Sequence, residues 1–296
     1  PVFVGLPAAL LRWIKKVPLI FWVLDLWPES LSAVGAVRSP KILNMVGRIV
    51  TFIYARCDLI LAQSKGFIPQ IKKYCLADAH IEYFPSWAED IYEWDESELA
   101  PEVESRPEMF TIVFTGNIGV MQDFSSILAA AELLKDHKNI RWLIVGDGRQ
   151  GDWLRSEVNR RGLQDIVLLL GRYPHQRMPS FYKHADALLV SLKSDPVVSM
   201  TIPGKVQSYL MAGLPILGML DGQGATVIQE AEAGLVSPAS DSARLADAIV
   251  KMLSMTAEER AKMGGRGQLY AKREFDRTEL IERVEMWMRE LQVQGE

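Results

Sequence analysis

The segment Phe110-Thr-Ile-Val-Phe-Thr115-Gly116 decides the fold, because a short apolar run rich in β-formers stops at a glycine. The same pattern returns at Arg141–Val145 before Gly146 and at Ile166–Leu170 before Gly171, with helical spacing between the runs. Continuous apolar strands that alternate with helices are typical of a parallel sheet covered on both faces. The sequence therefore predicts a doubly wound α/β domain.

The pattern continues toward the C-terminus. We predict further strands at 187–191, 215–220 and 235–236, and helices at 124–134, 151–161, 179–184 and 204–212, with three more helices after the last strand. Asp123 is the predicted N-cap of the first of these helices. Gly213 and Pro215 are helix-stop signals after residue 212, and Asp276 and Glu279 have capping-box spacing at the last helix.

A second, smaller sheet is predicted before residue 85. Its strands are 19–24, 59–62 and 81–84, and its helices are 42–56 and 65–74. Three strands are few for a doubly wound domain, so we expect a truncated N-terminal domain over residues 1–95. A C-terminal domain over 96–275 and a terminal helix over 276–296 complete the predicted organisation. The boundary lies within the acidic, proline-containing stretch 85–107, which reads as a linker.

Composition limits the functional class. The chain has 296 residues, of which 49% are hydrophobic and 24% charged, as in globular proteins. A net charge of −4 argues against a protein that coats nucleic acid. The two cysteines, Cys57 and Cys75, cannot form a disulfide framework, so a reducing, cytoplasmic compartment is expected. Charges and Pro18 interrupt the apolar stretch 7–24, which therefore does not predict a membrane span.

Glycines gather where the predicted strands end. The turns are Thr115-Gly-Asn-Ile-Gly119, Val145-Gly-Asp-Gly148, Leu170-Gly-Arg172 and Asp221-Gly-Gln-Gly224. Because glycine lets backbone N–H groups approach an oxyanion, four such turns on one sheet edge favour a phosphorylated ligand. The alternative is that each glycine merely ends a strand. Residues 146–151 also fit G-x-G-x-x-G, and Arg172 would suit a 2′-phosphate, so an NADP-dependent dehydrogenase remains a minor interpretation.

Positive charge for such a ligand has to come from the protein if no metal takes part. The sequence contains no D-x-D pair that would hold a divalent cation on a diphosphate. Lys205, at the start of the helix 204–212, is the best-placed candidate, although a lysine there also suits a solvated surface. We therefore predict that no metal and no cofactor is bound.

Several motifs occur in an order typical of one family. They are Gly116-Asn-Ile-Gly-Val-Met-Gln-Asp123, Val145-Gly-Asp-Gly148, Ala185-Asp186-Ala187, Pro203-Gly-Lys-Val-Gln-Ser-Tyr-Leu-Met-Ala-Gly-Leu-Pro215 and Gly222-Gln-Gly224. This series resembles the C-terminal half of GT-B glycosyltransferases of family 4 (group 1). Asp25-Leu-Trp-Pro-Glu-Ser30 and Phe84-Pro-Ser-Trp-Ala-Glu89 make it most similar to the L-fucosamine transferase subgroup of O-antigen biosynthesis.

The resemblance implies two Rossmann-like domains that face a cleft, a last helix that crosses back to the N-terminal domain, and metal-independent transfer from a UDP-sugar. It also implies strands before Pro1 that this chain lacks. The chain departs from the family at three positions. Gln122 stands where a second basic residue is usual, and Met200 and Ser208 stand near the positions of two usual glutamates.

The resemblance also assigns roles to residues. The diphosphate would be held by Lys205, Asn117, Gln122 and the N–H groups of Gly119, Gly222 and Gly224, which would stabilise the leaving group. Arg172 and Tyr173 would meet the nucleobase, and Gly116, Gly146, Gly148, Ser208 and Tyr209 complete the predicted donor site. The catalytic candidates are Lys205 with Asp25 and Glu29, which would contact the acceptor or act as general base, although Asp25 also suits a cap.

The acceptor implied is a lipid-linked saccharide, which needs a membrane surface. Trp13 beside Arg12, Lys15 and Lys16 suits anionic headgroups, and residues 1–84 carry a net charge of +5. We therefore expect peripheral contact at the cytoplasmic face of the inner membrane, and no nucleic acid partner. Two other classes stay open: a nucleotide-sugar 2-epimerase on the same scaffold, and a non-catalytic nucleotide-binding fragment.

Overall fold

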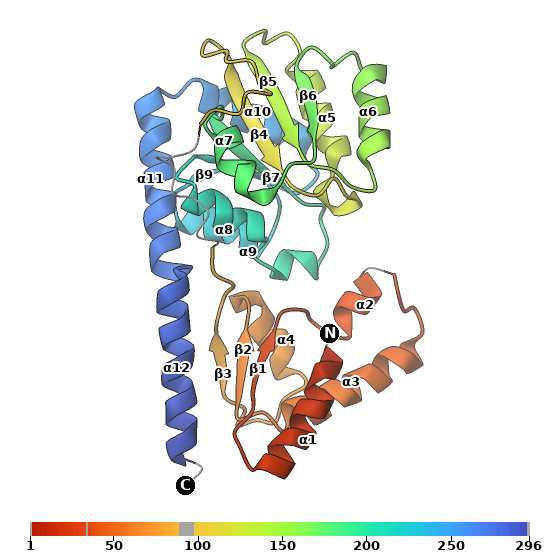
Figure 1. Cartoon of the computed structure of the whole chain (residues 1–296). Coiled ribbons are helices and arrows are strands. Elements are labelled where there is room, and N and C mark those ends of the chain that lie inside the picture. Colours follow the sequence, from red (N-terminus) through yellow and green to blue (C-terminus); the bar gives the residue numbers. More distant parts are fainter. Residues whose placement is uncertain (1, 34, 89–97, 295–296) are drawn as a thin grey trace. The chain divides into compact units, whose positions relative to one another are not determined.

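The computed structural model of the chain describes residues 2–33, 35–88 and 98–294 (Figure 1). The chain divides into two compact units. Unit 1 comprises residues 1–87, 195–202 and 275–296, and unit 2 comprises 88–194 and 203–274. The predicted boundary at residue 95 and most of the acidic part of the linker lie outside the described residues. Segment 195–202, which we had assigned to the second domain, belongs to unit 1.

Unit 2 is built on six parallel strands. They are β4 (Phe110–Thr115), β5 (Ile140–Val145), β6 (Val167–Gly171), β7 (Ala187–Ser191), β8 (Ile216–Met219) and β9 (Gly234–Ser237), in the spatial order β6-β5-β4-β7-β8-β9. The strand order reverses between β4 and β7, which is the topological switch point of a doubly wound sheet. Every residue of β4, β5 and β7 is buried, as their continuous apolar character predicted.

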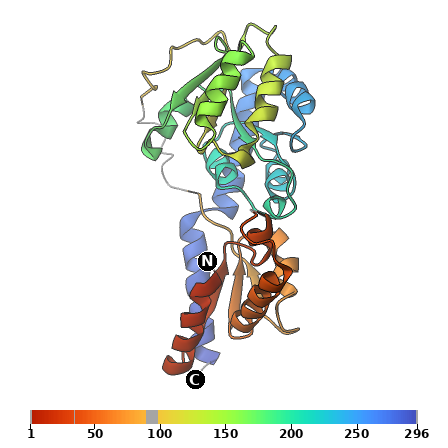
Figure 2. The same ribbon diagram turned by 90° about the vertical axis from the view of Figure 1, so that its right-hand side faces the viewer.

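Helices cover both faces of this sheet (Figure 2). One face carries α5 (Phe124–Leu133), α6 (Gly151–Arg160) and α10 (Ser242–Leu253), which enclose a core centred on Trp142. The other carries α7 (Met178–Tyr182), α8 (Gly204–Met211) and α9 (Gln223–Glu230), of which α9 was not predicted, and α11 (Ala257–Glu274) packs on α8. Short 3₁₀ turns η4 (Val120–Gln122) and η5 (His175–Arg177) precede α5 and α7.

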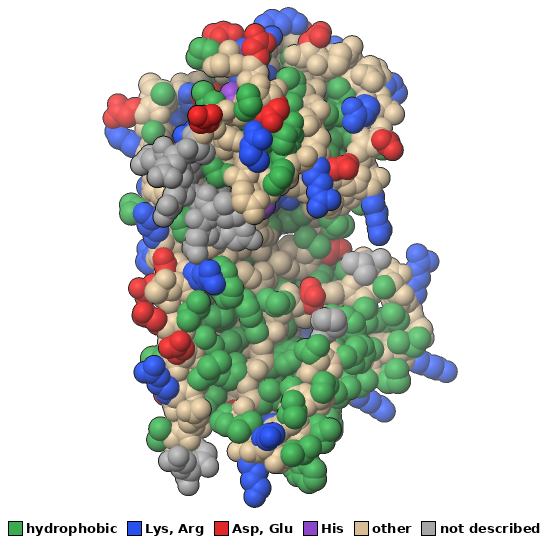
Figure 3. Space-filling model, in the orientation of Figure 1, with side chains coloured by type: hydrophobic (Ala, Val, Ile, Leu, Met, Phe, Trp, Pro, Cys, Tyr) green, Lys and Arg blue, Asp and Glu red, His purple; other side chains and the backbone are tan. Residues whose placement is uncertain are grey.

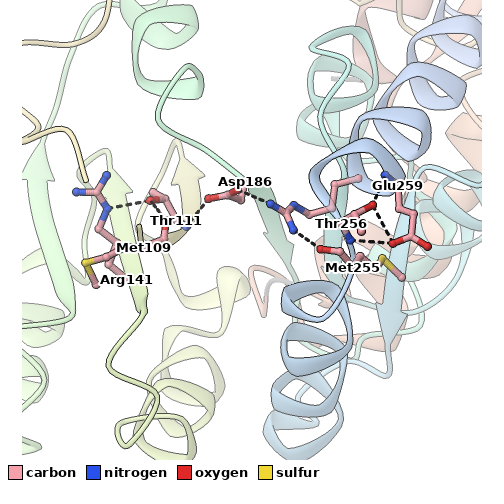
Figure 4. A network of polar contacts seen from close by, with 8 residues as sticks. Met109, Thr111, Arg141, Asp186, Met255, Thr256 and Glu259 are labelled. Atoms are coloured by element: carbon pink, nitrogen blue, oxygen red, sulfur yellow. Dashed lines mark hydrogen bonds and ion pairs between the residues drawn. The ribbon is translucent and has the colours of Figure 1, made fainter. Parts of the chain in front are cut away.

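A polar network fastens the amino-terminal ends of the strands (Figure 4). Asp186 accepts from the N–H of Thr111 at 2.9 Å and from the Arg260 guanidinium of α11 at 2.9 Å. The buried guanidinium of Arg141 donates to the Thr111 hydroxyl at 2.8 Å and to the carbonyl of Glu104 at 2.7 Å. Because the network lies at the end opposite the strand-end turns, it supports the fold rather than a ligand site.

The signals that predicted where helices start and end are partly confirmed. Gly213 has φ = +67° after α8, the left-handed conformation of a C-terminal glycine. Asp276 accepts from the N–H of Glu279 at 3.0 Å, as its spacing predicted. Asp123 is the N-cap residue of α5, as predicted, but its carboxylate accepts from the hydroxyls of Ser126 (2.8 Å) and Ser240 (2.6 Å) instead of from a helix N–H.

Unit 1 contains three parallel strands, β1 (Ile20–Val23), β2 (Leu59–Ala62) and β3 (Ile81–Tyr83), in sequence order. Its other elements are η1 (Val2–Val4), α1 (Gly5–Lys15), α2 (Glu29–Ala33), α3 (Pro40–Tyr54), η2 (Lys65–Phe67), α4 (Ile68–Lys72), η6 (Val198–Met200) and α12 (Arg277–Gln294). One face of the sheet packs on α3 and α4. The other packs on α12, where the Trp287 ring lies 6.0 Å from that of Phe84.

Candidate functional site

A pocket of about 810 Å³ opens at the carboxyl ends of β4, β5 and β6, within unit 2. Six of the predicted donor-site residues line it: Gly116, Asn117, Gly146, Gly148, Arg172 and Tyr173. Five lining residues were missed: Val145, Asp147, Pro174, His175 and Met178. Each missed residue follows or precedes a predicted one closely in sequence, so the strand-end turns were the right signal and their extent was underestimated.

The glycine turns are joined to one another by backbone hydrogen bonds. The N–H of Gly116 donates to Val145 at 2.8 Å, and the N–H of Gly146 donates to Gly171 at 2.8 Å. Gly146 has φ = +152°, and a Cβ there would lie 1.8 Å from the carbonyl oxygen of Gly116. These glycines therefore allow three turns to pack closely. The N–H groups of Gly116 and Gly146 are thus already satisfied and are not available to an anion in the pocket.

Other predicted phosphate donors are also engaged. The N–H of Gly119 donates to Gln122 Oε1 at 3.1 Å, so a phosphate would have to displace this side chain to reach it. The carbonyl of Gln122 accepts from Ser191 at 2.7 Å, so η4 is held against β7. Gly222 and Gly224 lie at the start of α9 and do not line this pocket. Gly224 packs closely, because a Cβ there would meet the side chains of Leu220 and Pro203.

Lys205 lies beside the pocket. A Cβ built on Gly116 would stand 2.9 Å from Lys205 Nζ, and the ammonium lies 5.0 Å from the centre of the Phe114 ring. Across the described residues, Lys205 has no hydrogen bond or carboxylate partner. Burial disfavours its charged form and lowers its pKa. A half-buried ammonium without an acidic partner is energetically costly, and a bound anion would offset that cost.

A buried cluster of hydroxyl groups lies directly behind Lys205. The N–H of Thr115 donates to the Tyr209 hydroxyl at 3.0 Å, and Thr115 Oγ1 lies 2.9 Å from the Tyr182 hydroxyl. Tyr209 is completely buried, so it lies behind the pocket wall and not on the pocket surface. Ser208 is half-buried on the same helix and is likewise not among the pocket residues.

The far side of the pocket is aromatic and basic. The ring of Tyr173 lies 4.8 Å from that of Phe181, and the Arg177 guanidinium lies 5.7 Å from each ring centre. Arg177 is itself fixed by Glu102 at 2.8 Å. Arg172 is exposed at the pocket rim. This arrangement offers a flat apolar ring and a cation, which suits a heterocyclic base.

The two predicted carboxylates belong to unit 1 and are held differently. Glu29 begins α2 and accepts from the Tyr74 hydroxyl at 2.9 Å. Burial, together with this carboxylate, raises the pKa of Tyr74 to about 12. The second oxygen of Glu29 is buried with no partner. Asp25 is exposed after β1, at the end of a 340 Å³ groove along that strand.

Metal ligands do not gather at either place. Over residues 2–33, 35–88 and 98–294, no three His, Cys, Asp or Glu side chains come together in a way that would hold an ion.

In the same residues, no helix has the length and apolar character needed to cross a bilayer.

Comparison with known proteins relates this site to a family. Residues 109–255, which contain the pocket and Lys205, match the family model described as "Glycosyl transferases group 1". The chain is 24% identical over 270 residues to "Probable glycosyltransferase WbjE" of Pseudomonas aeruginosa, covering 85% of this chain and 64% of that protein. It is 25% identical over 143 residues to "Putative colanic acid biosynthesis glycosyl transferase WcaI" of Escherichia coli, covering 47% and 34%. The chain thus spans less than two thirds of these curated relatives.

Solved structures establish the fold. The crystal structure of Anabaena HepE in complex with UDP superposes with a TM-score of 0.79 at 14% identity, over 98% of this chain and 77% of that one. The predicted GT-B fold class is therefore confirmed.

Proposed function

We propose that this chain is a glycosyltransferase that moves a sugar from a UDP-sugar donor to a lipid-linked saccharide. The donor sugar that the sequence favours is an N-acetylated deoxyhexosamine, by resemblance to the L-fucosamine transferases. The family match over residues 109–255 and the fold shared with UDP-bound HepE support transfer from a nucleotide sugar. The relative WcaI, described as a putative colanic acid biosynthesis glycosyl transferase, supports a role in polysaccharide assembly.

The observation that carries the proposal is the ammonium of Lys205 beside the Gly116 turn. It is half-buried and lacks an acidic partner in the described part of the chain. When a glycosidic bond to a nucleoside diphosphate breaks, negative charge develops on the β-phosphate. A cation already fixed at that place stabilises the departing group without reorganising during the reaction. Lys205 is therefore the residue that we assign to leaving-group stabilisation.

The rest of the donor would follow the pocket. The side-chain amide of Asn117 lines the pocket next to Gly116, where it would add a second donor to the phosphates. The base would lie toward Tyr173 and Arg172. Asp147 lines the same wall, and a carboxylate there is better suited to ribose hydroxyls than to phosphate. Lys205 would thus replace part of the phosphate contact that is lost where Gln122 stands in place of the usual basic residue.

Nucleotide binding gives the first test. We expect calorimetry to detect UDP binding to the wild-type protein, and EDTA to leave the affinity unchanged. Lys205→Ala should weaken UDP binding about tenfold to hundredfold, since a charge-assisted contact contributes about 1.5–3 kcal/mol. Lys251→Ala, which removes an exposed lysine of α10, is the matched control. Unchanged affinity in Lys205→Ala, or binding that EDTA abolishes, would refute this assignment.

Turnover gives the second test. UDP release from UDP-sugars should require a lipid-linked saccharide acceptor, and Asp25→Asn should lower kcat while leaving UDP affinity unchanged. Asp25 is the exposed carboxylate of the two candidates, whereas Glu29 is bound by Tyr74. Epimerisation of the donor without transfer would favour the 2-epimerase interpretation. Binding of UDP without any turnover would favour the non-catalytic fragment.

Helix α1 supports the membrane part of the proposal. It buries its small residues Gly5 and Ala9 and exposes Leu10, Trp13 and Ile14, and Trp13 is 77% exposed. A Cβ at Gly5 would lie 2.5 Å from Ile53, so the small residues let α1 lie close to α3. Figure 3 shows hydrophobic side chains gathered over the face of unit 1 that carries β1 and α1. An outward apolar face bordered by cations suits an interfacial helix.

Vesicle sedimentation tests this surface. We expect binding to vesicles that contain anionic lipid and little binding to neutral vesicles. Each basic residue near such a surface adds about 1 kcal/mol, so Lys15→Glu with Lys16→Glu should release the protein. Binding should also weaken as salt shortens the Debye length from ~10 Å at 0.1 M to ~3 Å at 1 M. Salt-independent attachment to neutral vesicles would contradict the proposal.

A further inference from the structure

We propose that Tyr209 is a positioning residue that sets Lys205 against the phosphate side of the donor pocket, although Tyr209 itself touches no ligand. The inference rests on the proposed function, because it concerns how the UDP site is built. It starts from the buried hydroxyl cluster at the end of β4.

The ladder between β4 and β7 stops early. Paired residues are Ile112 with Ala187 and Val113 with Leu188, whereas the ladder from β4 to β5 continues to Thr115 with Val145. In a strand, alternate residues direct their N–H and C=O groups to opposite sides. Since Gly116 donates to β5, Thr115 directs its backbone groups to the β7 side, where the strand pairing has ended.

Tyr209 takes the place of the missing strand partner. Its hydroxyl accepts from the N–H of Thr115 at 3.0 Å and lies 3.4 Å from the Thr115 carbonyl oxygen. Thr115 is 5% exposed and Tyr209 is fully buried, so water does not satisfy these groups. A buried N–H without a partner is unfavourable, and this bond therefore fixes α8 to the last residue of β4.

Lys205 stands one turn before Tyr209 on α8, and residues four apart lie on the same face of a helix. Tyr209 contacts Thr115, while the Lys205 ammonium contacts the positions on both sides of it, Phe114 and Gly116. The bond from the Thr115 N–H to Tyr209 therefore holds α8 against β4 at the level where the ammonium lies. Burial lowers the pKa of Lys205, and such a cation gains most from a phosphate only if it is correctly placed.

Tyr182 provides a matched control. Its hydroxyl lies 2.9 Å from Thr115 Oγ1, it is also buried, and its ring lies 5.8 Å from that of Tyr209. It belongs to α7, however, and not to the helix that carries Lys205. Tyr182→Phe and Tyr209→Phe therefore each remove one hydroxyl group from this cluster, and only Tyr209 lies on the helix that carries Lys205.

The experiment compares UDP with uridine, which lacks the phosphates. Tyr209→Phe should weaken UDP binding about tenfold and leave uridine binding unchanged, whereas Tyr182→Phe should not alter the ratio of the two affinities. In a Lys205→Ala background, Tyr209→Phe should lower the affinity for UDP by less than about a further twofold. The effects of two residues that act as one unit are not additive. Equal losses for UDP and uridine, or additive losses in the double variant, would overturn the inference.

Two further outcomes separate this inference from the proposed function. If the wild-type protein does not bind UDP, the proposed function fails and this inference fails with it. If the wild type binds UDP and Tyr209→Phe binds it equally well, only this inference fails. Should Tyr209→Phe not fold, amide exchange in the wild type decides. UDP should then slow exchange at Thr115 and along α8 together, and protection confined to residues 116–119 would overturn the inference.

Discussion

The ammonium of Lys205 and the α-carbon of Gly116 are so close that no side chain fits between them. A methyl group on Gly116 would lie 2.8 Å from Lys205 Cε and 2.9 Å from Nζ. Gly116 also has φ = +121°, a conformation that other residues rarely adopt. The backbone conformation therefore favours glycine at this position, and a methyl group there would also displace the flexible end of the Lys205 side chain.

Gly116→Ala should consequently displace Lys205 and weaken UDP binding by about tenfold or more. Gly162→Ala is the control, because Gly162 also has a positive φ (+65°) but nothing lies within 4 Å of its added methyl group. Both variants should lose thermal stability through strain of about 1–2 kcal/mol. Only Gly116→Ala should lose affinity in calorimetry. Equal affinities for the two variants would show that Lys205 does not depend on this space.

Binding of UDP should depend on pH through Lys205. Burial lowers the pKa of Lys205 from its usual 10.5, so its positive charge is lost as the pH rises toward and through that lowered value. UDP affinity should therefore fall on the alkaline side, and the phosphate groups do not titrate there. Lys205→Arg should remove the alkaline loss, because guanidinium stays charged above pH 12. Calorimetry between pH 7 and 10 measures both curves, and an identical alkaline loss in Lys205→Arg would assign the effect elsewhere.

Gly146→Ala should unfold unit 2 rather than merely impair its pocket. The new methyl group would lie 1.8 Å from the carbonyl oxygen of Gly116. Residues 116 and 146 both belong to turns whose backbone is held in place by hydrogen bonds. Such an overlap exceeds what repacking relieves, and the loss should be above about 3 kcal/mol. Gly265→Ala, in the helix α11 with open space around it, should instead be neutral or stabilising by up to about 1 kcal/mol. Thermal unfolding followed by circular dichroism distinguishes the two.

The ion pair of Arg12 with Asp58 should make unit 1 sensitive to acid. Arg12 donates to both carboxylate oxygens of Asp58 at 2.9 and 2.6 Å, and this bond lowers the pKa of Asp58 below 3.8. A lowered carboxylate pKa adds stability that is complete above the unfolded value and disappears as the pH falls through the folded value. Asp58→Asn should therefore destabilise by about 1 kcal/mol at pH 7, discounted for partial exposure, and by little near pH 2. Urea unfolding at both pH values checks this, with the exposed Glu258→Gln as control.

Sequence reasoning succeeded where local chemistry decides the structure. Strands 59–62, 110–115 and 187–191 were predicted to the residue, because buried parallel strands are uninterrupted apolar runs. The helix 223–230 was missed, since it begins with Gly222-Gln-Gly224, which reads as a turn. Asp123 was placed correctly at the start of its helix, but its carboxylate partner Ser240, 117 positions away in sequence, was not predicted. No local pattern reveals such a partner.

The candidate site, too, was predicted only in part from the sequence. Six pocket residues were found because glycine turns at strand ends mark one edge of a sheet. The bond from the Gly119 N–H to Gln122 was not predicted, because it depends on the conformation of the Gln122 side chain. Tyr209 was assigned to the donor, whereas its burial and its bond to Thr115 depend on where the β4 to β7 pairing ends. The point where this pairing ends depends on both strands, so the sequence of either strand alone does not predict it.

Unit 1 is assembled from chain segments that the ribosome makes at very different times. Leu59, Leu61 and Phe84 emerge early, but the helix that covers them, with Leu280 and Trp287, follows the whole of unit 2. At roughly 5–20 residues per second, this delay is on the order of ten to forty seconds. During synthesis the apolar face of β1–β3 therefore stays uncovered until α12 has been made. By that time all residues of unit 2 have already been made. That face is the part of the nascent chain on which a chaperone would act.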